Sequence, residues 1–164
     1  MEALRWVSIV ALATWVGGLV TLGAVVAPEL FQLLARHDPA GGRELAAYLF
    51  GALLGSFQYV AWVAGGLLLA SLALRAAIGP RPRRTALRVW TVAAMLTASV
   101  LLSLVIAPRI DAIRAETKGT IAARPADDPL RVQFGRLHGL SSGLMLATVL
   151  AGLGLLWAEM KDRH

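Results

Sequence analysis

Long runs of apolar residues without one charged side chain dominate this chain. Four windows contain no Asp, Glu, Lys or Arg, and each is at least 20 residues long: 6–28, 45–74, 89–108 and 137–158. A helix of about 20 residues crosses the ~30 Å hydrocarbon core of a bilayer. Charge-free helices of this length are unusual in soluble domains. The pattern therefore predicts four transmembrane helices.

Turn and capping residues set the expected ends of these helices. We expect helices over 4–35, 42–76, 85–118 and 129–160, which together form one all-α transmembrane domain over 1–164. Asp128 before Pro129 is typical of a helix N-cap followed by a first-turn proline. Pro28 and Pro108 lie inside apolar runs, where a proline removes one backbone donor and bends the helix. We expect a structural kink at each.

Two stretches 80 residues apart carry the same motif. An apolar residue followed by Ala-Pro precedes Glu29 in the first copy and Arg109 in the second. The pattern Phe-Gly-x-Leu-x-Gly also occurs twice, from Phe50 and from Phe134, at an offset of 84. These matches predict an internal repeat. The integral membrane four-helix bundle would then consist of two parallel-repeat helical hairpins, related by an axis along the membrane normal.

The repeat makes Glu29 and Arg109 candidates for a shared polar site. Equivalent positions in parallel hairpins lie at equal depth, and His138 falls near that level. A charge costs roughly 2.5–3.5 kcal/mol at the centre of a membrane helix on insertion scales, so pairing of opposite charges would offset part of this cost. We predict a polar, ion-pair site of Glu29, Arg109 and His138. The simpler interpretation is that both charges extend to the headgroups and that His138 bonds to a neighbouring helix.

Glycines spaced four apart predict close helix packing. Gly51 and Gly55 begin the returning helix of the first hairpin, and Gly135 and Gly139 begin that of the second. Small residues at this spacing let two membrane helices approach closely. The spacing fits contacts within one chain and contacts in a homo-oligomer equally well.

Charge and aromatic residues indicate the orientation. The net charge is +6 and the pI is about 11.0, but the basic residues flank the apolar windows, where they contact anionic lipid rather than nucleic acid. The link 75–88 holds five arginines and no acid. Trp6, Trp90 and Trp157 fall at the same interface as this link. We expect both termini to be cytoplasmic and the protein to be a multi-pass protein of the bacterial inner (cytoplasmic) membrane.

Composition and motifs exclude several chemistries. The chain has no Cys, which excludes disulfides and thiolate metal sites. It shows no phosphate-binding glycine loop and no Ser/His/Asp arrangement, and His138 is the single histidine within a charge-free window. We predict no cofactor, no metal site and a non-enzymatic role, as a partner subunit of another membrane protein or a small carrier. The alternative is a membrane redox protein that binds haem, quinone or metal through His138.

Three motifs carry a resemblance to a known family: Trp15-Val16-Gly17-Gly18, Ala27-Pro28-Glu29-Leu30-Phe31 and Phe134-x-x-x-His138-x-x-Ser141. The chain resembles the transmembrane-protein-205-like family, catalogued in bacteria as domain of unknown function 4149, over about residues 4–157. The resemblance implies a small four-helix integral membrane protein with a His in its last helix. Other members often carry an Asn after the His–Ser pair, where this chain has Gly143-Leu144. The family has no settled activity, so the resemblance implies a fold and leaves the function open.

Overall fold

The computed structural model describes residues 2–78, 84–118 and 120–161, and within them it contains helices and no strand. Four helical stretches are long and apolar enough to cross a membrane: Glu2–His37, Gly42–Ile78, Thr85–Thr117 and Pro129–Lys161. The prediction of four apolar crossings is confirmed, and each end lies within two residues of the expected one. The chain is a multi-pass helical membrane protein. Residues 79–83 of the arginine-rich link lie outside the described residues.

The first and third crossings each consist of two α-helices joined by a π-helical turn. The first crossing is α1 (Glu2–Thr21), η1 (Leu22–Val26) and α2 (Ala27–His37), and the third is α4 (Thr85–Leu101), η2 (Leu102–Ile106) and α5 (Ala107–Thr117). The second crossing is the single helix α3 (Gly42–Ile78) and the fourth is α6 (Pro129–Lys161). A short 3-10 helix, η3 (Thr120–Ala123), lies in the loop before α6.

Each π turn directly precedes an Ala-Pro pair. The backbone N–H of Ala27 donates to the carbonyl of Leu22, and that of Ala107 to the carbonyl of Leu102, so each bond spans five residues instead of four. A proline has no N–H, and its ring collides with the carbonyl four residues earlier in an α-helix. A wider π turn shifts that carbonyl away from the ring. The helix therefore continues past Pro28 and Pro108.

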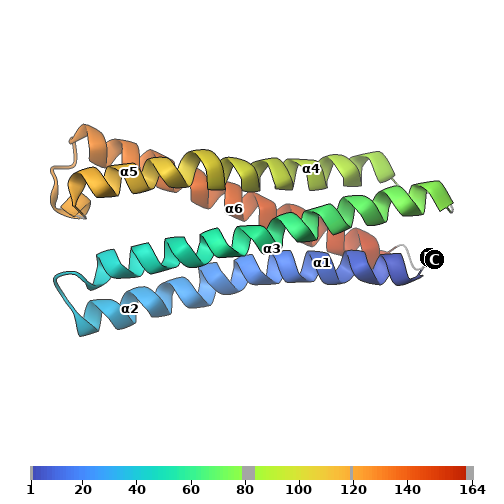
Figure 1. The fold of residues 1–164 in the computed structure, drawn as a ribbon, viewed down its shortest axis with the longest axis horizontal. Helices are drawn as coiled ribbons and strands as arrows, with labels where there is room; N and C mark the ends of the chain where they lie inside the picture. The colour runs from blue at the N-terminus through green and yellow to red at the C-terminus, as the bar shows by residue number, and fades with distance from the viewer. Residues whose placement is uncertain (1, 79–83, 119, 162–164) are drawn as a thin grey trace.

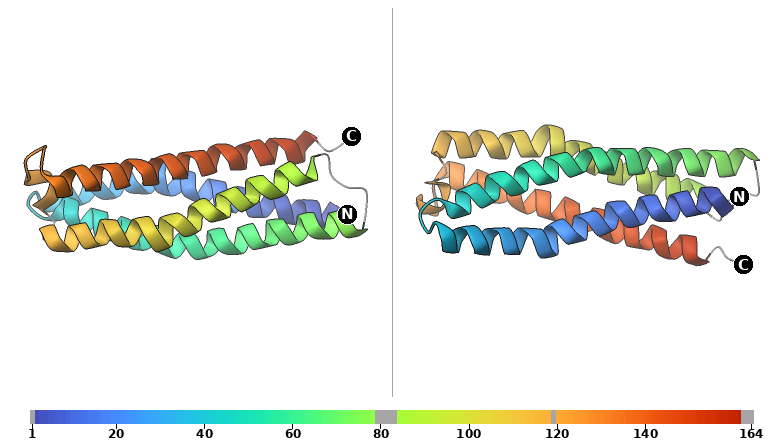
Figure 2. Two further views of the ribbon diagram at one scale, coloured as in Figure 1. Left: turned by 90° about the horizontal axis from the view of Figure 1, so that it is seen from above. Right: turned by 60° about the horizontal axis from the view of Figure 1, so that its bottom comes forward.

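The four crossings form an elongated bundle (Figures 1 and 2). α1 packs against α3 and α6, and α4 packs against the same two helices. The start of α1, the end of α3, the start of α4 and the end of α6 lie together at what we call the terminal end. The loops from α2 to α3 and from η3 to α6 lie at the opposite, loop end.

Most of the core lies in the terminal half of the bundle. Its largest fully buried side chains are Trp15, Leu12 and Val92. Apolar residues of all four crossings pack around them: Ala11, Leu19, Ala61, Ala64, Leu68, Leu72, Met95 and Leu155. Because every crossing contributes, burial of this apolar surface fixes the helices against one another here.

The loop half is packed more sparsely. A second, smaller cluster joins Leu102, Ile106 and Ile110 to partly buried residues of α6. α2 packs on α3 and contains no buried residue, whereas α5 packs on α6. The described residues therefore form two helix pairs at the loop end, with few contacts from one pair to the other.

Aspartate side chains cap the turns at the loop end. Asp38 accepts hydrogen bonds from the backbone N–H groups of Ala40 and Gly41 at 3.0 and 3.1 Å. Asp128 accepts from the N–H of Leu130 at 2.8 Å, as expected of an N-cap, and pairs with Arg124 at 2.9 Å. Desolvation opposes the charged form of Asp128, but these partners outweigh it, and the pKa of its carboxyl is lowered.

Candidate functional site

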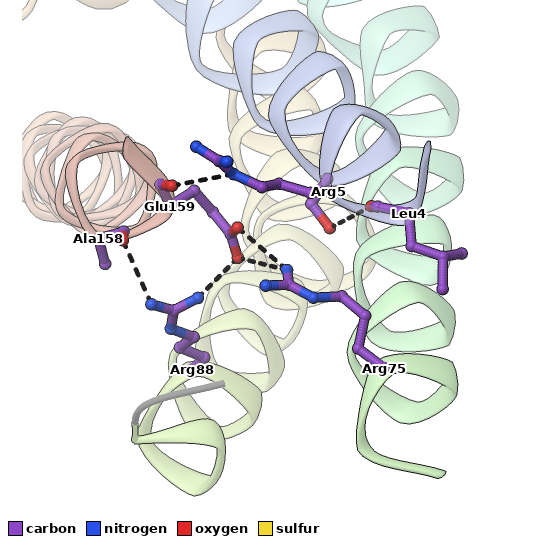
Figure 3. A network of polar contacts seen from close by, with 7 residues as sticks. Leu4, Arg5, Arg75, Arg88, Ala158 and Glu159 are labelled. Atoms are coloured by element: carbon purple, nitrogen blue, oxygen red, sulfur yellow. Dashed lines mark hydrogen bonds and ion pairs between the residues drawn. The ribbon is translucent and has the colours of Figure 1, made fainter. Parts of the chain in front are cut away.

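A buried cluster of charged side chains lies at the terminal end of the bundle (Figure 3). Glu159 of α6 is 3% exposed, and its carboxylate faces two guanidinium groups. Nη1 of Arg75 on α3 lies 3.0 Å from both carboxylate oxygens, and Nη1 of Arg88 on α4 lies 2.7 Å from Oε1. Arg75 and Arg88 are themselves buried, at 7% and 5% exposed. Two helices are thus tied to a third through one carboxylate.

A third arginine brings α1 into the cluster. Nε of Arg5 donates to the backbone carbonyl of Glu159 at 3.2 Å, and Nη2 of Arg88 donates to that of Ala158 at 3.3 Å (Figure 3). The Nη2 atom of Arg5 is buried and has no hydrogen-bond partner among the described residues. Each of the four crossings therefore contributes at least one residue to the cluster, which joins the whole bundle at this end.

Helical spacing explains why these side chains meet. Arg88 lies four residues before Val92 and seven before Met95, and both of these residues are in the core. Glu159 lies four residues after Leu155, also in the core. Residues at these spacings share one face of an α-helix. The charged residues therefore extend the apolar core stripes by about one turn and point inward.

The depth of the cluster is marked by tryptophans. Trp6, Trp90 and Trp157 are each more than half exposed and lie one or two residues from Arg5, Arg88 and Glu159. Tryptophans on membrane helices concentrate at the interface between hydrocarbon and headgroups. The cluster consequently lies at the level of that interface, inside the helix bundle.

A second polar group lies deeper, between α3 and α4. The hydroxyl of Ser99 donates to Oε1 of Gln58, and Nε1 of Trp62 donates to the Ser99 oxygen at 3.0 Å. Gln58 and Ser99 are both buried. These bonds satisfy polar atoms that would be costly in hydrocarbon, and they link the two hairpins.

The structure does not bring Glu29 and Arg109 together. Both side chains are exposed, on α2 and α5, and among the described residues neither takes part in an ion pair or a side-chain hydrogen bond. The ion pair predicted between them is not formed. The reason is that α2 packs on α3 while α5 packs on α6, so equal depth does not place the two side chains face to face.

His138 lies elsewhere and has different neighbours. Its ring is exposed and stacks on Phe134 of the same helix, with centroids 6.0 Å apart and planes 3° apart. Arg114 of α5, rather than Arg109, lies over the Phe134 ring at 5.6 Å. Nη1 of Arg114 also donates to the carbonyl of Ala47 on α3 at 3.4 Å. Arg114 thus contacts both helix pairs at the loop end.

The glycines predicted to pack helices face little protein. A Cβ atom added at Gly55, Gly135 or Gly139 would meet nothing within 4 Å, and one at Gly51 would lie 3.9 Å from Arg114 Nη1. Close packing within the chain occurs at other glycines. A Cβ at Gly152 would lie 2.3 Å from Val16 of α1.

Sequence reasoning placed the basic residues, with Arg5, Arg75 and Arg88 among them, at the membrane interface. It assigned no role to Glu159 and missed the cluster. The available signal was their helical register with core residues, but helices that are apolar on all sides do not reveal which side faces the core. In the described part of the chain, no group of three or more His, Cys, Asp or Glu residues could hold a metal ion.

A bundle of four apolar crossings joined by a buried ion cluster defines the class: a small multi-pass helical membrane protein. Residues 10–119 match the model of the family described as a domain of unknown function (DUF4149), and the chain belongs to this family. The match spans most of the first crossing and continues through α5, and it leaves out α6, which carries His138 and Glu159. Comparisons with curated proteins and with solved structures give no match.

Proposed function

We propose that this chain is a non-enzymatic subunit of the bacterial inner membrane that docks a transmembrane helix of another membrane protein against the loop half of α6. The buried residues of α6 are Thr148, Gly152, Leu155 and Glu159, so its loop half contains none and leaves helix surface uncovered. The partner role is favoured over a small carrier because Glu29 and Arg109 do not assemble a shared site.

The observation that carries the proposal is the exposed surface of α6 around His138. This polar side chain lies at the edge of the charge-free part of α6 and is exposed. Polar residues within membrane helices almost always face protein or water instead of lipid. Beside it, Gly135, Gly139 and Gly143 have nothing within 4 Å of a Cβ position. Together they form a thin helix surface with a polar group, which suits another transmembrane helix.

We propose a non-enzymatic role because the buried polar groups are bonded to one another. The carboxylate of Glu159 is occupied by Arg75 and Arg88, and Gln58 by Ser99. Buried polar groups that are fully bonded to one another rigidify a fold, which supports a structural role for these residues.

The proposed orientation places the termini in the cytoplasm and the loop end outside. It is supported by the five arginines of the link 75–88 at the terminal end, since cytoplasmic loops carry an excess of Lys and Arg. The proposed internal repeat is supported by the positions of η1 and η2, which begin 80 residues apart in sequence and precede the same Ala-Pro pair. We also assign the chain to the transmembrane-protein-205-like group, on the motifs of the first and last helices.

Cross-linking in the membranes of the native host tests the docking role. Because the chain has no Cys, Gly139→Cys gives one thiol, which a benzophenone maleimide converts into a photo-cross-linker. We expect one defined adduct with a different membrane protein. Gly66→Cys is the matched control, since Gly66 on α3 also has nothing within 4 Å. It should give no such adduct.

Two results would contradict the proposal. Absence of any adduct specific to Gly139→Cys would mean that this surface faces lipid. An adduct of twice the chain's own mass would show that a second copy covers the surface, which would make the protein a homo-oligomer instead of a subunit of another assembly.

A second function is favoured by one feature of His138. Its ring nitrogens form no hydrogen bond among the described residues, so they remain available to bind a haem, a quinone or a metal ion. A visible absorption spectrum of protein purified in mild detergent separates the two functions. A chromophore lost in His138→Ala would establish the redox alternative, and a colourless protein favours the subunit role.

A further inference from the structure

In the charged cluster at the terminal end, one guanidinium nitrogen has no hydrogen-bond acceptor among the described residues. Three guanidinium groups, of Arg5, Arg75 and Arg88, surround the carboxylate and the carbonyl of Glu159. Nη2 of Arg5 is buried and has no hydrogen-bond partner among the described residues. A guanidinium donor without a partner is costly in a low-dielectric environment, which favours an anion beside it.

Arg5 is also the accessible member of the cluster. Arg75 and Arg88 are buried, whereas Arg5 is part-exposed at the junction of α1 and α6 (Figure 3). Nη2 itself is buried, but the long side chain of Arg5 can turn this nitrogen toward a ligand that approaches from outside the bundle.

The depth of Arg5 identifies the kind of anion. Arg5 precedes Trp6 by one residue, and Trp6 is 57% exposed at the interface. One residue corresponds to about 1.5 Å along a helix, so Arg5 lies just beyond the hydrocarbon, where lipid phosphates are. A guanidinium matches a phosphate with two parallel N–H···O bonds.

We propose that Arg5 binds the phosphate of an anionic phospholipid headgroup at the α1–α6 junction, and that this phosphate completes the arginine–glutamate cluster. The site is distinct from the α6 docking surface, which lies in the other half of the bundle. The bound group is a phosphodiester monoanion, and the lipid supplies it because the site lies at headgroup depth.

Lipid-dependent binding and stability test the proposal. The full chain is placed in nanodiscs of phosphatidylglycerol or of phosphatidylcholine, and thermal unfolding is measured. Native mass spectrometry then counts the lipids retained after release. We expect wild-type protein to unfold at a higher temperature in phosphatidylglycerol and to retain that lipid. Arg5→Ala should bind it about tenfold more weakly, the lower range for loss of a charged hydrogen bond. Arg5→Lys should be intermediate because it keeps the charge but not the planar donor pair.

Arg84→Asn is the matched control, because it removes one positive charge at the same end. Arg84 is exposed and has a φ of 57°, which Asn adopts readily. This variant should bind lipid as the wild type does. Inorganic phosphate added to phosphatidylcholine nanodiscs separates the two phosphate sources, and we expect no stabilisation by it.

The proposal is overturned if wild-type stability is the same in the two lipids, a result that does not depend on whether any variant folds. It is also overturned if Arg84→Asn and Arg5→Ala lose binding equally, which would indicate general surface charge. Stabilisation by inorganic phosphate alone would show a site for a soluble anion instead of a lipid.

Discussion

Glu159 is the residue on which the charged cluster depends. Its carboxylate is the acceptor for both Arg75 and Arg88, and its backbone carbonyl accepts from Arg5. A buried ion pair gains little over a well-packed apolar contact, because the charges lose their hydration. Loss of one member is nevertheless severe, since the remaining charges stay buried without a counter-ion.

We therefore predict that Glu159→Ala lowers the free energy of unfolding by about 3–5 kcal/mol. Simultaneous replacement of Arg75, Arg88 and Glu159 by Met should recover much of this loss, because no uncompensated charge remains. Reversible unfolding in detergent micelles measures both variants. Glu44→Ala, which removes an exposed carboxylate at the loop end, should change stability little. An equal effect of the two Glu substitutions would contradict the role assigned to the cluster.

For single residues, the sequence predicted some contacts and missed others. Asp128 was predicted as an N-cap and does accept from the α6 backbone, because capping depends on local sequence. The pairing of Arg75 and Arg88 with Glu159 depends on contacts 71 to 84 residues apart, and no local pattern encodes them. Glu29 and Arg109 were paired from an apparent repeat, but their side chains do not meet.

At the scale of helices, the two prolines produce the same local structure. The sequence predicted a bend at Pro28 and Pro108, and the structure has a π turn before each. The presence of four crossings followed from the charge-free windows. Their ends followed from turn and capping residues, because the helices of 33 to 37 residues extend beyond those windows. The packing surfaces could not be predicted from the sequence. Glycines spaced four apart form the same pattern whether they face protein or lipid.

The contact of α6 with α1 gives a test of helix packing. A Cβ at Gly152 would lie 2.3 Å from Val16 Cγ2, whereas one at Gly154 would meet nothing within 4 Å. Gly152→Val should therefore destabilise the protein by about 1–3 kcal/mol through overpacking. Gly154→Val on the same helix should be near neutral. Chemical unfolding of both variants measures the difference, and equal stability would mean that α1 and α6 are not in close contact at Gly152.

For the whole molecule, the two ends of the bundle differ in how they are held. The terminal end combines the main apolar core with the cluster around Glu159. At the loop end, the one side-chain hydrogen bond found between the helix pairs in the described residues is that of Arg114 to Ala47. We conclude that the terminal end holds the bundle together, whereas fewer contacts hold the loop end.

Distance measurements between spin labels test this difference most directly. The chain has no Cys, so pairs of labels can be placed at exposed positions of α3 and α6: Ile78 with Met160 at the terminal end, and Tyr48 with Val132 at the loop end. In lipid nanodiscs without a partner, pulsed electron paramagnetic resonance should give a narrow distance distribution for the first pair and a broader one for the second. Equal widths, or a narrower distribution at the loop end, would contradict this account.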